Sequence, residues 1–425
     1  MNRIGELNAF LAANPSVYHA IDAIGQMLRK AGYTALSEGE NWELKAGGKY
    51  YLTRNGSAIM AFRVPESAPK GFLISAAHGD RPCFKVKENG VLAGQYTRLA
   101  VEKYGGMLIA PWLDRPLSVA GRVVVETETG MQTKLVAYPG APLLIPNVAI
   151  HMNRSANDGY KWNPAVDTIP LMGNKETKNF WEELENLAGG KILGHDLYLF
   201  VRENPCVWGM NQEFFSAQAI DDLECAWCCA QGFLQAKPTA NIPVLCVFDS
   251  EEVGSSSYQG AASDFLQSGI SRICNALGLD EKQQLAKSFM VSADNAHALH
   301  PNHPELADSA NAPVMNGGVV IKYNANQKYT TDGLSGAIFR KICQKANVPV
   351  QTYCNRADIA GGSTLGNISL SQVSVPCVDI GLAQLAMHSC YETAGVKDVD
   401  YMVDAMTAYY ETVLEMSADG AVCLK

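Results

Sequence analysis

The amino-acid sequence predicts an α/β fold, a mixed β-sheet sandwiched by helices, with a β-rich domain inserted into it. The first observation behind this prediction is a set of short apolar runs that end in charged clusters. They read GFLISAAHGD, IPVLCVFDSEE and KSFMVSAD, and PCVDIGL leads toward the last histidine. Helical stretches separate these runs. This arrangement is typical of buried strands in a sheet whose two faces are covered by helices.

The second observation is a change of pattern in the middle of the chain. Between about residues 90 and 210 the sequence has β-type segments such as LSVAGRVVVET and TKLVAYPG, turn-rich intervals and one acidic helix-like stretch, NFWEELENLAGG. We therefore expect two domains. A discontinuous one is formed by residues 1–90 and 210–425, and an inserted β-rich one by residues 91–209.

Two amphipathic helices are predicted near the ends of the chain. The first, over about residues 15–31, follows the helix-start signal Asn14-Pro15-Ser16, and its apolar face consists of Val17, Ile21, Ile24 and Leu28. The second closes the chain with an apolar stripe at spacings of three and four, formed by Val399, Met402, Met406, Tyr409 and Val413. Both stripes indicate helices packed against a core.

The composition favours a peptide or another small solute as the partner of this chain. Of the 425 residues, 47% are hydrophobic and 18% are charged, as in ordinary globular proteins. The formal net charge of −9 and the lack of basic runs argue against nucleic acid and anionic membranes. The N-terminal stretch MNRIGELNAFLAANPS lacks the pattern of a signal peptide, so we expect a cytoplasmic location.

The twelve cysteines are interpreted as reduced core residues. Most lie inside apolar runs such as VLCVF and RICNAL. Cys225 and Cys228 have the spacing of a redox or zinc knuckle, but a second such pair is missing, and the stretch DDLECAWCCAQGFL has the character of a buried helix. We therefore favour the structural reading of this pair.

Side chains that can bind metal ions follow the predicted strands. They are His78 and Asp80, Asp221, Glu251 and Glu252, Asp294, and finally His388. Ligands of α/β sheets collect at the carboxyl ends of the strands. Imidazole nitrogens and carboxylate oxygens suit zinc, manganese or cobalt. The joint placement of these residues predicts a metal site at this edge of the sheet.

Acidic side chains directly after an apolar strand also point to cations. Asp249, Glu251 and Glu252 would repel one another in a semi-buried place unless a positive charge compensates them. Two divalent ions would supply that charge, and a water bound between them would be acidic enough to form hydroxide near neutral pH. Hydrolysis of a peptide bond needs such a nucleophile.

Many segments also match one known family, in the family's order. They are GGKYYLTRNGSAIMAF, AAHGDRPCFKVK, YGGMLIAPWLDRPLSVAGRV, IPNVAIHMNR, FDSEEVGSSSYQGA, SADNAHALHPNHPE, GGVVIKYN, STLGNIS and QLAMHSCYET. Through these blocks the chain resembles the aspartyl aminopeptidases nearly end to end. The resemblance implies the di-zinc exopeptidase fold with an inserted dimerisation domain. It also implies a homo-oligomer built from dimers, a dodecamer, and removal of N-terminal residues, including acidic ones, from peptides.

The resemblance assigns roles to the metal-binding candidates. It implies that one zinc ion is held by His78, Asp221 and Asp294 and the other by Asp221, Glu252 and His388, so that Asp221 bridges the two. Glu251 remains free as the general base. Asp80 would accept a hydrogen bond from the far nitrogen of His78, and the peptide bond after Asp221 is expected to be cis.

Two further residues, Lys322 and His151, are carried over from matching blocks. Lys322, in GGVVIKYN, is the position to which the resemblance points for a cation that could pair with an acidic substrate side chain, and Arg356, in CNRADIAGGSTLG, is another candidate for this role. His151, in IPNVAIHMNR, is expected to enter the active site of a neighbouring subunit and donate a hydrogen bond to the developing oxyanion. A local hydrogen-bonding role for this loop histidine is the alternative.

The chain departs from the family pattern beside the proposed metals. Gly79 and Arg81 stand where family members usually have threonine and serine, and Asp222 stands where they have asparagine. Arg81 adds positive charge and Asp222 adds negative charge near the site, so a preference for acidic residues does not follow from the resemblance alone.

Two other functions are compatible with the same residues. A di-zinc carboxypeptidase or deacylase would use the same metal scaffold with a different lid domain, which the block YGGMLIAPWLDRPLSVAGRV disfavours. A non-catalytic assembly protein would have lost the chemistry. Retention of Glu251 together with all five ligand positions argues against it.

Overall fold

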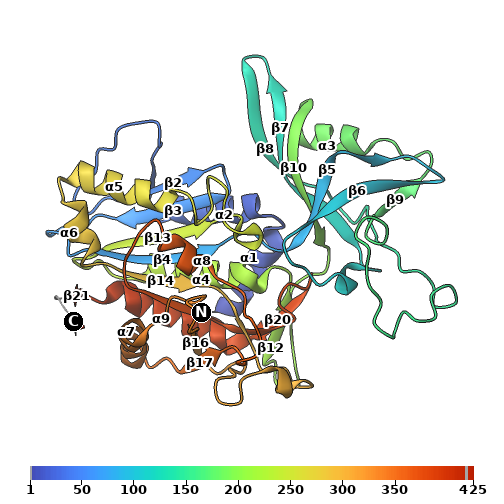
Figure 1. The fold of residues 1–425 in the computed structure, drawn as a ribbon. Helices are drawn as coiled ribbons and strands as arrows, with labels where there is room; N and C mark the ends of the chain where they lie inside the picture. Colours follow the sequence, from blue (N-terminus) through green and yellow to red (C-terminus); the bar gives the residue numbers. More distant parts are fainter. Residues whose placement is uncertain (1, 417–419) are drawn as a thin grey trace.

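The computed structural model describes residues 2–416 and 420–425, and Figure 1 shows their arrangement. The largest sheet has nine strands, and its predicted mixed character is confirmed. In spatial order the strands are β1 (Thr34–Ala35), β2 (Lys49–Arg54), β3 (Ala58–Arg63), β13 (Ile242–Phe248), β4 (Phe72–His78), β14 (Phe289–Ala293), β18 (Cys377–Gly381), β16 (Val319–Tyr323) and β17 (Val350–Cys354).

The four apolar runs singled out in the sequence form adjacent parallel strands at the centre of this sheet. β13 pairs with β4, β4 with β14, and β14 with β18, all in parallel. The register places Phe248, the last residue of β13, beside His78, the last residue of β4. The carboxyl ends of these strands therefore meet at one edge, where the charged clusters that follow them are brought together.

Helices cover both faces of the nine-stranded sheet, as Figure 1 shows. One apolar core joins a face of the sheet to α1 (Arg3–Ala13), α2 (Val17–Lys30), α4 (Ile220–Gln235), α7 (Gly333–Lys345) and α9 (Val396–Glu411). A second core joins the opposite face to α5 (Phe265–Leu277), α6 (Glu281–Leu285) and α8 (Leu365–Ser369). Alternate strand residues divide between the cores: Leu73 belongs to the first and Ile74 to the second. This period of two is the geometry of a strand buried on both sides.

A six-stranded antiparallel sheet forms a separate lobe, on the right in Figure 1. In spatial order its strands are β8 (Gly130–Ala137), β7 (Leu117–Thr127), β10 (Ile192–Val201), β5 (Cys83–Leu92), β6 (Tyr96–Tyr104) and β9 (Leu171–Asn174). Its own apolar core includes α3 (Phe180–Ala188), the acidic helix seen in the sequence. The first strand begins at Cys83, before the expected border at residue 91.

The structure also contains a smaller five-stranded sheet. It consists of β11 (Cys206–Trp208), β12 (Phe214–Ala217), β20 (Glu392–Gly395), β19 (Ala383–Leu385) and β15 (Ala296–His297). These strands are too short to give a clear period in the sequence, and we did not predict them. They connect the segments that carry Asp221, Asp294 and His388.

Both predicted terminal helices are present, with one correction. The N-terminal stripe lies on α2, while α1, which precedes it, was not predicted. The C-terminal stripe lies on α9, but Val413 is outside that helix, because the chain turns extended at Thr412. Val413 instead exchanges two backbone hydrogen bonds with Lys425, beside the hairpin of β21 (Leu414–Met416) and β22 (Val422–Leu424).

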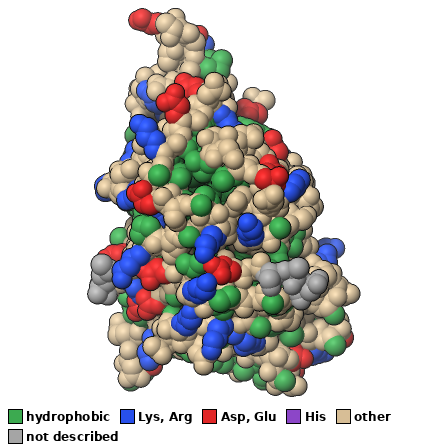
Figure 2. All heavy atoms as spheres, turned by 90° about the vertical axis from the view of Figure 1, so that its left-hand side faces the viewer, with side chains coloured by type: hydrophobic (Ala, Val, Ile, Leu, Met, Phe, Trp, Pro, Cys, Tyr) green, Lys and Arg blue, Asp and Glu red, His purple; other side chains and the backbone are tan. Residues whose placement is uncertain are grey.

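The surface at the end of the molecule that carries α6 and β21 has mixed charge. Figure 2 shows Lys and Arg side chains interspersed with Asp and Glu on this face. Glu415, for example, lies 2.5 Å from the Lys70 ammonium and 3.0 Å from that of Lys425. Within residues 2–416 and 420–425, none of the helices is long and apolar enough to cross a membrane.

The cysteines have the reduced form expected from the sequence. All twelve are free thiols, and most are buried. Cys225 and Cys228 lie on α4 and are fully buried, so the stretch around them is the buried helix that we favoured over a redox or zinc knuckle.

Candidate metal centre

Five metal-binding side chains converge at the carboxyl edge of the nine-stranded sheet. His78 ends β4, Glu252 lies in the turn after β13, and Asp294 directly follows β14. Asp221 stands in the first turn of α4, and His388 lies in the loop between β19 and β20. Parallel pairing of the strands brings His78, Glu252 and Asp294 together. Asp221 and His388 lie in segments that are connected to strands of the five-stranded sheet.

The five side chains form two groups that share Asp221. The ligating atoms of His78, Asp221 and Asp294 lie within 4.8 Å of one another, and so do those of Asp221, Glu252 and His388. The Nε2 atom of His78 is 3.5 Å from Asp221 Oδ1, and the Nε2 atom of His388 is 3.4 Å from Asp221 Oδ2. Each oxygen of the Asp221 carboxylate therefore faces a different histidine. A third set of neighbouring atoms comes from His78, Glu251 and Glu252.

The environment of Asp221 suits a cation. Its side chain is buried, and its Oδ1 atom has no hydrogen-bond donor within the described part of the chain. A buried carboxylate oxygen without a donor is costly unless a positive charge compensates it. The peptide bond between Asp221 and Asp222 is cis, as expected from the resemblance.

His388 is held in one orientation by the segment that follows β6. Its Nδ1 atom lies 2.6 Å from the carbonyl oxygen of Gly106, and its own carbonyl accepts the N–H of Leu108 at 3.0 Å. Since a carbonyl can only accept, Nδ1 carries the proton and Nε2 is left as the free nitrogen that faces Asp221. Close packing fits this segment to the site, because a Cβ at Gly105 would meet the Glu252 Cβ at 3.2 Å.

Asp80 lies behind His78 but is hydrogen-bonded differently from our expectation. The Nδ1 atom of His78 donates to the backbone carbonyl of Asp80 at 3.1 Å, and the Asp80 Oδ1 atom is 3.4 Å away. The Asp80 carboxylate accepts the N–H groups of Glu251 and Glu252, each at 3.1 Å, and the Tyr104 hydroxyl at 2.8 Å. Asp80 therefore orients the turn that carries Glu251 and Glu252 as well as the imidazole of His78.

The acid–base properties of the site reflect buried carboxylates in close contact. Burial raises the pKa of Glu251 to about 8 and that of Glu252 well above its usual value, the latter also through the Asp221 charge. Burial opposes protonation of His388, yet its contact with Asp221 raises the pKa of His388 to about 9. Burial also disfavours ionisation of Asp221, but His388 and His78 hold the pKa of this carboxyl below its usual range. Carboxylates in such close contact are stabilised by a shared proton or by a bound cation, and are unfavourable when all of them are ionised without one.

A cavity of about 400 Å³ opens onto the five side chains and Glu251. Lys322 lines it and, among the described residues, is the one Lys or Arg that does so. Its ammonium is buried, donates to the carbonyl of Asp294 at 2.7 Å, and lies 3.7 Å from Asp294 Oδ2. Asn295 also accepts from it, through its carbonyl at 3.3 Å.

Arg356 and His151, the other two candidates, do not line this cavity. Arg356 is partly exposed and forms an ion pair with Asp358 at 2.6 Å. His151 is exposed in the long loop between β8 and β9, in the six-stranded lobe. Within one chain, the structure does not bring either of them into the lining of the cavity.

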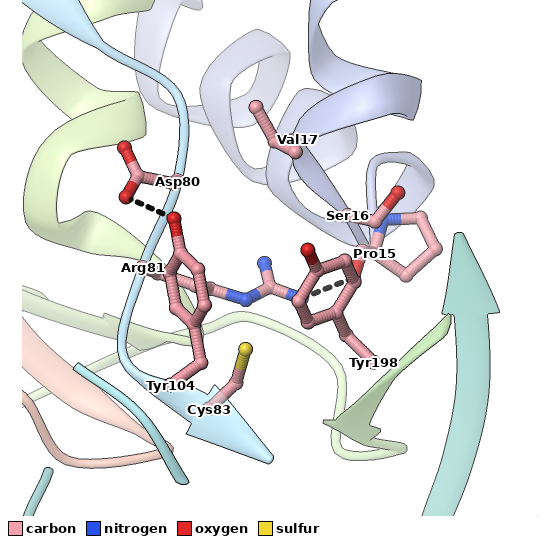
Figure 3. A pocket seen from close by; sticks show the side chains of 8 residues that line it. All are labelled: Pro15, Ser16, Val17, Asp80, Arg81, Cys83, Tyr104 and Tyr198. Atoms are coloured by element: carbon pink, nitrogen blue, oxygen red, sulfur yellow. Dashed lines mark hydrogen bonds between the residues drawn. The ribbon is translucent and has the colours of Figure 1, made fainter. Parts of the chain in front are cut away.

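Arg81, one of the departures from the family pattern, does not line the cavity of the metal-binding side chains. As Figure 3 shows, its guanidinium extends toward Tyr198 and Pro15, and it donates a hydrogen bond to the carbonyl of Pro15. Tyr104 stands beside it and bonds to Asp80. Arg81 thus contacts the segment that leads into α2 and does not line the cavity.

The other two departures are accommodated by their surroundings. A Cβ at Gly79 would approach Val17 Cγ2 to 3.3 Å, so this position packs tightly on α2. Asp222 is fully buried, and its Oδ2 atom accepts the N–H of His78 at 3.1 Å. Burial raises the pKa of Asp222 well above its usual value.

Sequence reasoning missed a set of buried polar side chains behind the site, among them Asn295, Gln384 and Glu392. Glu392 accepts the backbone N–H groups of Asp221 and His388. Its position four residues after His388, inside the matched block QLAMHSCYET, was the available signal. Burial and the Asp221 charge raise the pKa of Glu392 to about 8, while these two N–H groups lower it.

Residues 10–410 match the model of the aminopeptidase I zinc metalloprotease family, M18. The chain belongs to the M18 family. It is 41% identical over 423 residues to a probable M18 family aminopeptidase 2 from Clostridium novyi (strain NT), covering 95% of this chain and 98% of that protein. A similar relative from Pseudomonas aeruginosa (strain UCBPP-PA14) is 38% identical over 414 residues, covering 94% of this chain and 96% of that protein.

Solved structures of M18 proteins have the same fold. The structure described as the Ape4 and Nbr1 complex superposes with a TM-score of 0.93 at 34% identity, over 96% of this chain and 85% of that one. The S. cerevesiae mApe1 dodecamer gives 0.84 at 26% identity, over 96% of each chain. The M18 chain described here is therefore a metal-dependent aminopeptidase, and the fold prediction is confirmed.

Proposed function

We propose that this M18 protein removes N-terminal residues from peptides at a centre of two divalent metal ions, with zinc as the native metal. His78, Asp221 and Asp294 would hold one ion, and Asp221, Glu252 and His388 the other. The observation that carries this proposal is the position of Asp221, whose two oxygens face two different histidines at 3.5 and 3.4 Å. Zinc accepts such histidine and carboxylate donors, as do cobalt and manganese.

Glu251 is the proposed general base. Bound divalent ions would polarise a carbonyl and lower the pKa of water at the site. The Glu251 carboxylate lines the cavity and accepts no hydrogen bond from the residues that the structure describes, so it is free to take a proton from the attacking water. It would then return that proton to the leaving amine. Asp80 keeps the turn in place by accepting the N–H of Glu251 at 3.1 Å.

Peptides with an acidic first residue are the proposed finer substrate class. Lys322 supports this, because its ammonium is the cation that lines the cavity. Asp294 already balances part of its charge at 3.7 Å, so the expected preference is moderate. Arg356, which is paired with Asp358 on the surface, would contribute only if its loop moved.

The proposed active unit is a homo-oligomer built from dimers in the cytoplasm. The related mApe1 protein is described as a dodecamer. In the proposed dimer the β-rich domain of residues 91–209 pairs two subunits and brings His151 into the partner's cavity. The exposure of Val148, Ile150 and Met152 beside it, at 53%, 48% and 82%, supports a covered role for this loop in an assembly.

The test is cleavage of a panel of aminoacyl chromogenic substrates with and without a chelator. We expect release of the first residue, loss of activity with the chelator and recovery on adding zinc. Faster cleavage of Asp and Glu derivatives than of Leu and Ala derivatives would support the acidic preference. Cleavage restricted to substrates with a free C-terminal carboxylate would indicate a carboxypeptidase. Inactivity of zinc-loaded protein on all substrates would favour a non-catalytic assembly protein.

A further inference from the structure

A row of buried polar side chains lies behind the proposed metal centre. We call it the buried row, and it consists of Glu224, Asn295, Gln384 and Glu392. Each is at most 3% exposed. Polar groups buried this deeply are costly unless they are hydrogen-bonded, so their bonds are informative about what they hold in place.

Glu392 ends the row and contacts two proposed ligand residues through their backbones. Its Oε2 atom accepts the N–H of Asp221 at 3.1 Å, and its Oε1 atom accepts the N–H of His388 at 2.8 Å. The side-chain amide of Gln384 donates to the same Oε1 atom at 3.3 Å. Three donors therefore converge on one carboxylate, and two of them belong to residues that would bind the metal ions.

The rest of the row fixes Glu392 and extends to a third ligand segment. Gln384 accepts a hydrogen bond from the Asn295 amide at 2.7 Å, and this amide also donates to Glu224 at 2.9 Å. Asn295 directly follows Asp294 in the sequence. The buried row thus connects the segments of Asp221, Asp294 and His388, which belong to three distant parts of the chain.

The strand pairing explains why one carboxylate reaches both N–H groups. Glu392 begins β20, where it pairs with Ala217 of β12, the strand that leads into Asp221. His388 lies in the loop between β19 and β20, in a left-handed conformation with φ of 67°. Residues other than glycine rarely adopt this conformation, so the loop depends on its hydrogen bonds.

We propose that Glu392 is a positioning residue of the metal centre, which sets the separation of Asp221 and His388 by accepting the backbone N–H of both. The hydrogen bonds of the rest of the buried row hold the Glu392 side chain in place. The proposal rests on the function proposed above. A Gln at position 392 would present one acceptor oxygen and an NH₂ group, so either Asp221 or His388 would lose its acceptor.

Asp398 provides a matched control. It is also fully buried, and it accepts two backbone N–H groups, those of Asn316 at 2.5 Å and Gly318 at 2.9 Å. It stands in the first turn of α9 and does not line the cavity. Asp398→Asn therefore makes the same chemical change at a comparable carboxylate away from the metal centre.

The experiment measures zinc affinity and stoichiometry of the full-length protein by competition with a chromogenic chelator, alongside thermal unfolding. Loss of a residue that orients a metal ligand typically weakens metal binding about 10–100-fold. We expect Glu392→Gln to weaken at least one zinc equivalent by this factor, and Asp398→Asn to bind zinc like the parent even where its melting temperature falls. Gln384→Met should weaken the same equivalent to a smaller extent.

Several outcomes would overturn the inference. Parent-like zinc binding by Glu392→Gln contradicts it, and so does equal weakening by Asp398→Asn, which would indicate general destabilisation. If Glu392→Gln does not fold, the zinc affinity of Gln384→Met is the test. A zinc affinity equal to that of the parent in Gln384→Met would then contradict the inference. Failure of the parent protein to bind stoichiometric zinc would instead overturn the proposed function itself.

Discussion

The metal centre and the loop that carries His151 differ in what fixes the position of their side chains. At the metal centre, the parallel pairing of β13, β4 and β14 fixes the strand ends, and buried hydrogen bonds fix the rest. The loop between β8 and β9 is largely exposed. Asp114 holds its beginning by accepting both the backbone and the side-chain N–H of Asn147, at 2.9 and 2.7 Å. Beyond that point His151 is exposed.

This difference shows which functional groups one chain can complete by itself. The carboxylates and imidazoles of the centre need only the fold of their own subunit. A donor on an exposed loop acquires a defined position only when another surface covers it. We therefore expect substitutions at the centre to affect catalysis within each subunit, and substitutions in the loop to affect catalysis in the partner subunit.

The largest expected effect comes from the centre. Glu251→Gln should reduce turnover by about 10²–10⁴-fold, the usual range for loss of a general base. The amide keeps the size of the side chain but cannot take the proton. Steady-state kinetics on an aminoacyl substrate measure the effect. Zinc content serves as the control and should equal that of the parent.

Two results would contradict this role for Glu251. Turnover within a few-fold of the parent would show that another group is the base. Loss of a zinc ion in the variant would show that Glu251 is a ligand, as its place in the group with His78 and Glu252 allows.

A somewhat smaller effect is expected at the loop. His151→Phe should lower turnover by about 10²–10³-fold, since removal of one donor to an oxyanion costs about 2.7–4 kcal/mol of barrier. Zinc content and oligomer size should not change. A variant that loses its oligomeric state would instead assign the loop a role in assembly alone.

Subunit mixing tests both regions in one experiment. A mixed dimer of His151→Phe and Glu251→Gln subunits contains one site in which both groups are intact, provided that His151 acts on the partner. Activity should then recover in part after subunit exchange. Mixed oligomers of proven composition that remain inactive would refute delivery to the partner.

The sequence predicted the centre better than the loop for a physical reason. The runs GFLISAAHGD, IPVLCVFDSEE and KSFMVSAD became β4, β13 and β14, and parallel pairing then required their charged ends to meet. His151 lies in an exposed loop, and the sequence has no pattern that indicates which surface would cover such a loop. Its proposed role came from the family resemblance alone.

Other features escaped prediction because they depend on contacts between distant segments. The buried row joins Glu224, Asn295, Gln384 and Glu392 by hydrogen bonds. No local sequence pattern indicates that these distant positions meet. The end of α9 was misplaced at Val413 because its pairing with Lys425, rather than the apolar period, decides the conformation there.

The smallest expected effect lies where the two lobes meet. Burial, and next the charge of Arg81, lower the pKa of His19 to about 4. Arg81→Ser should raise this pKa, while burial still keeps it below 6.5. NMR titration of the His19 imidazole measures it, and turnover should stay within a few-fold of the parent because Arg81 does not line the cavity.

The sign of the accompanying stability change follows from the same titration. Because the folded-state pKa of His19 is below its unfolded value, its contribution is present above pH 6.5 and is lost as the pH falls toward 4. In Arg81→Ser that loss should be confined to a narrower pH range. An unchanged or lower His19 pKa in the variant would contradict the proximity of the two charges.

In the proposed centre, Asp221 is shared by two metal ions. The most direct test is elemental analysis of zinc per chain after metal-free protein is loaded and excess metal removed, for the parent, Asp221→Asn and Glu251→Gln. We expect about two zinc ions in the parent and in Glu251→Gln, and no more than one in Asp221→Asn, because the amide keeps only one of the two oxygens that face the histidines. Two tightly bound zinc ions in Asp221→Asn, or a single ion in the parent, would contradict this sharing.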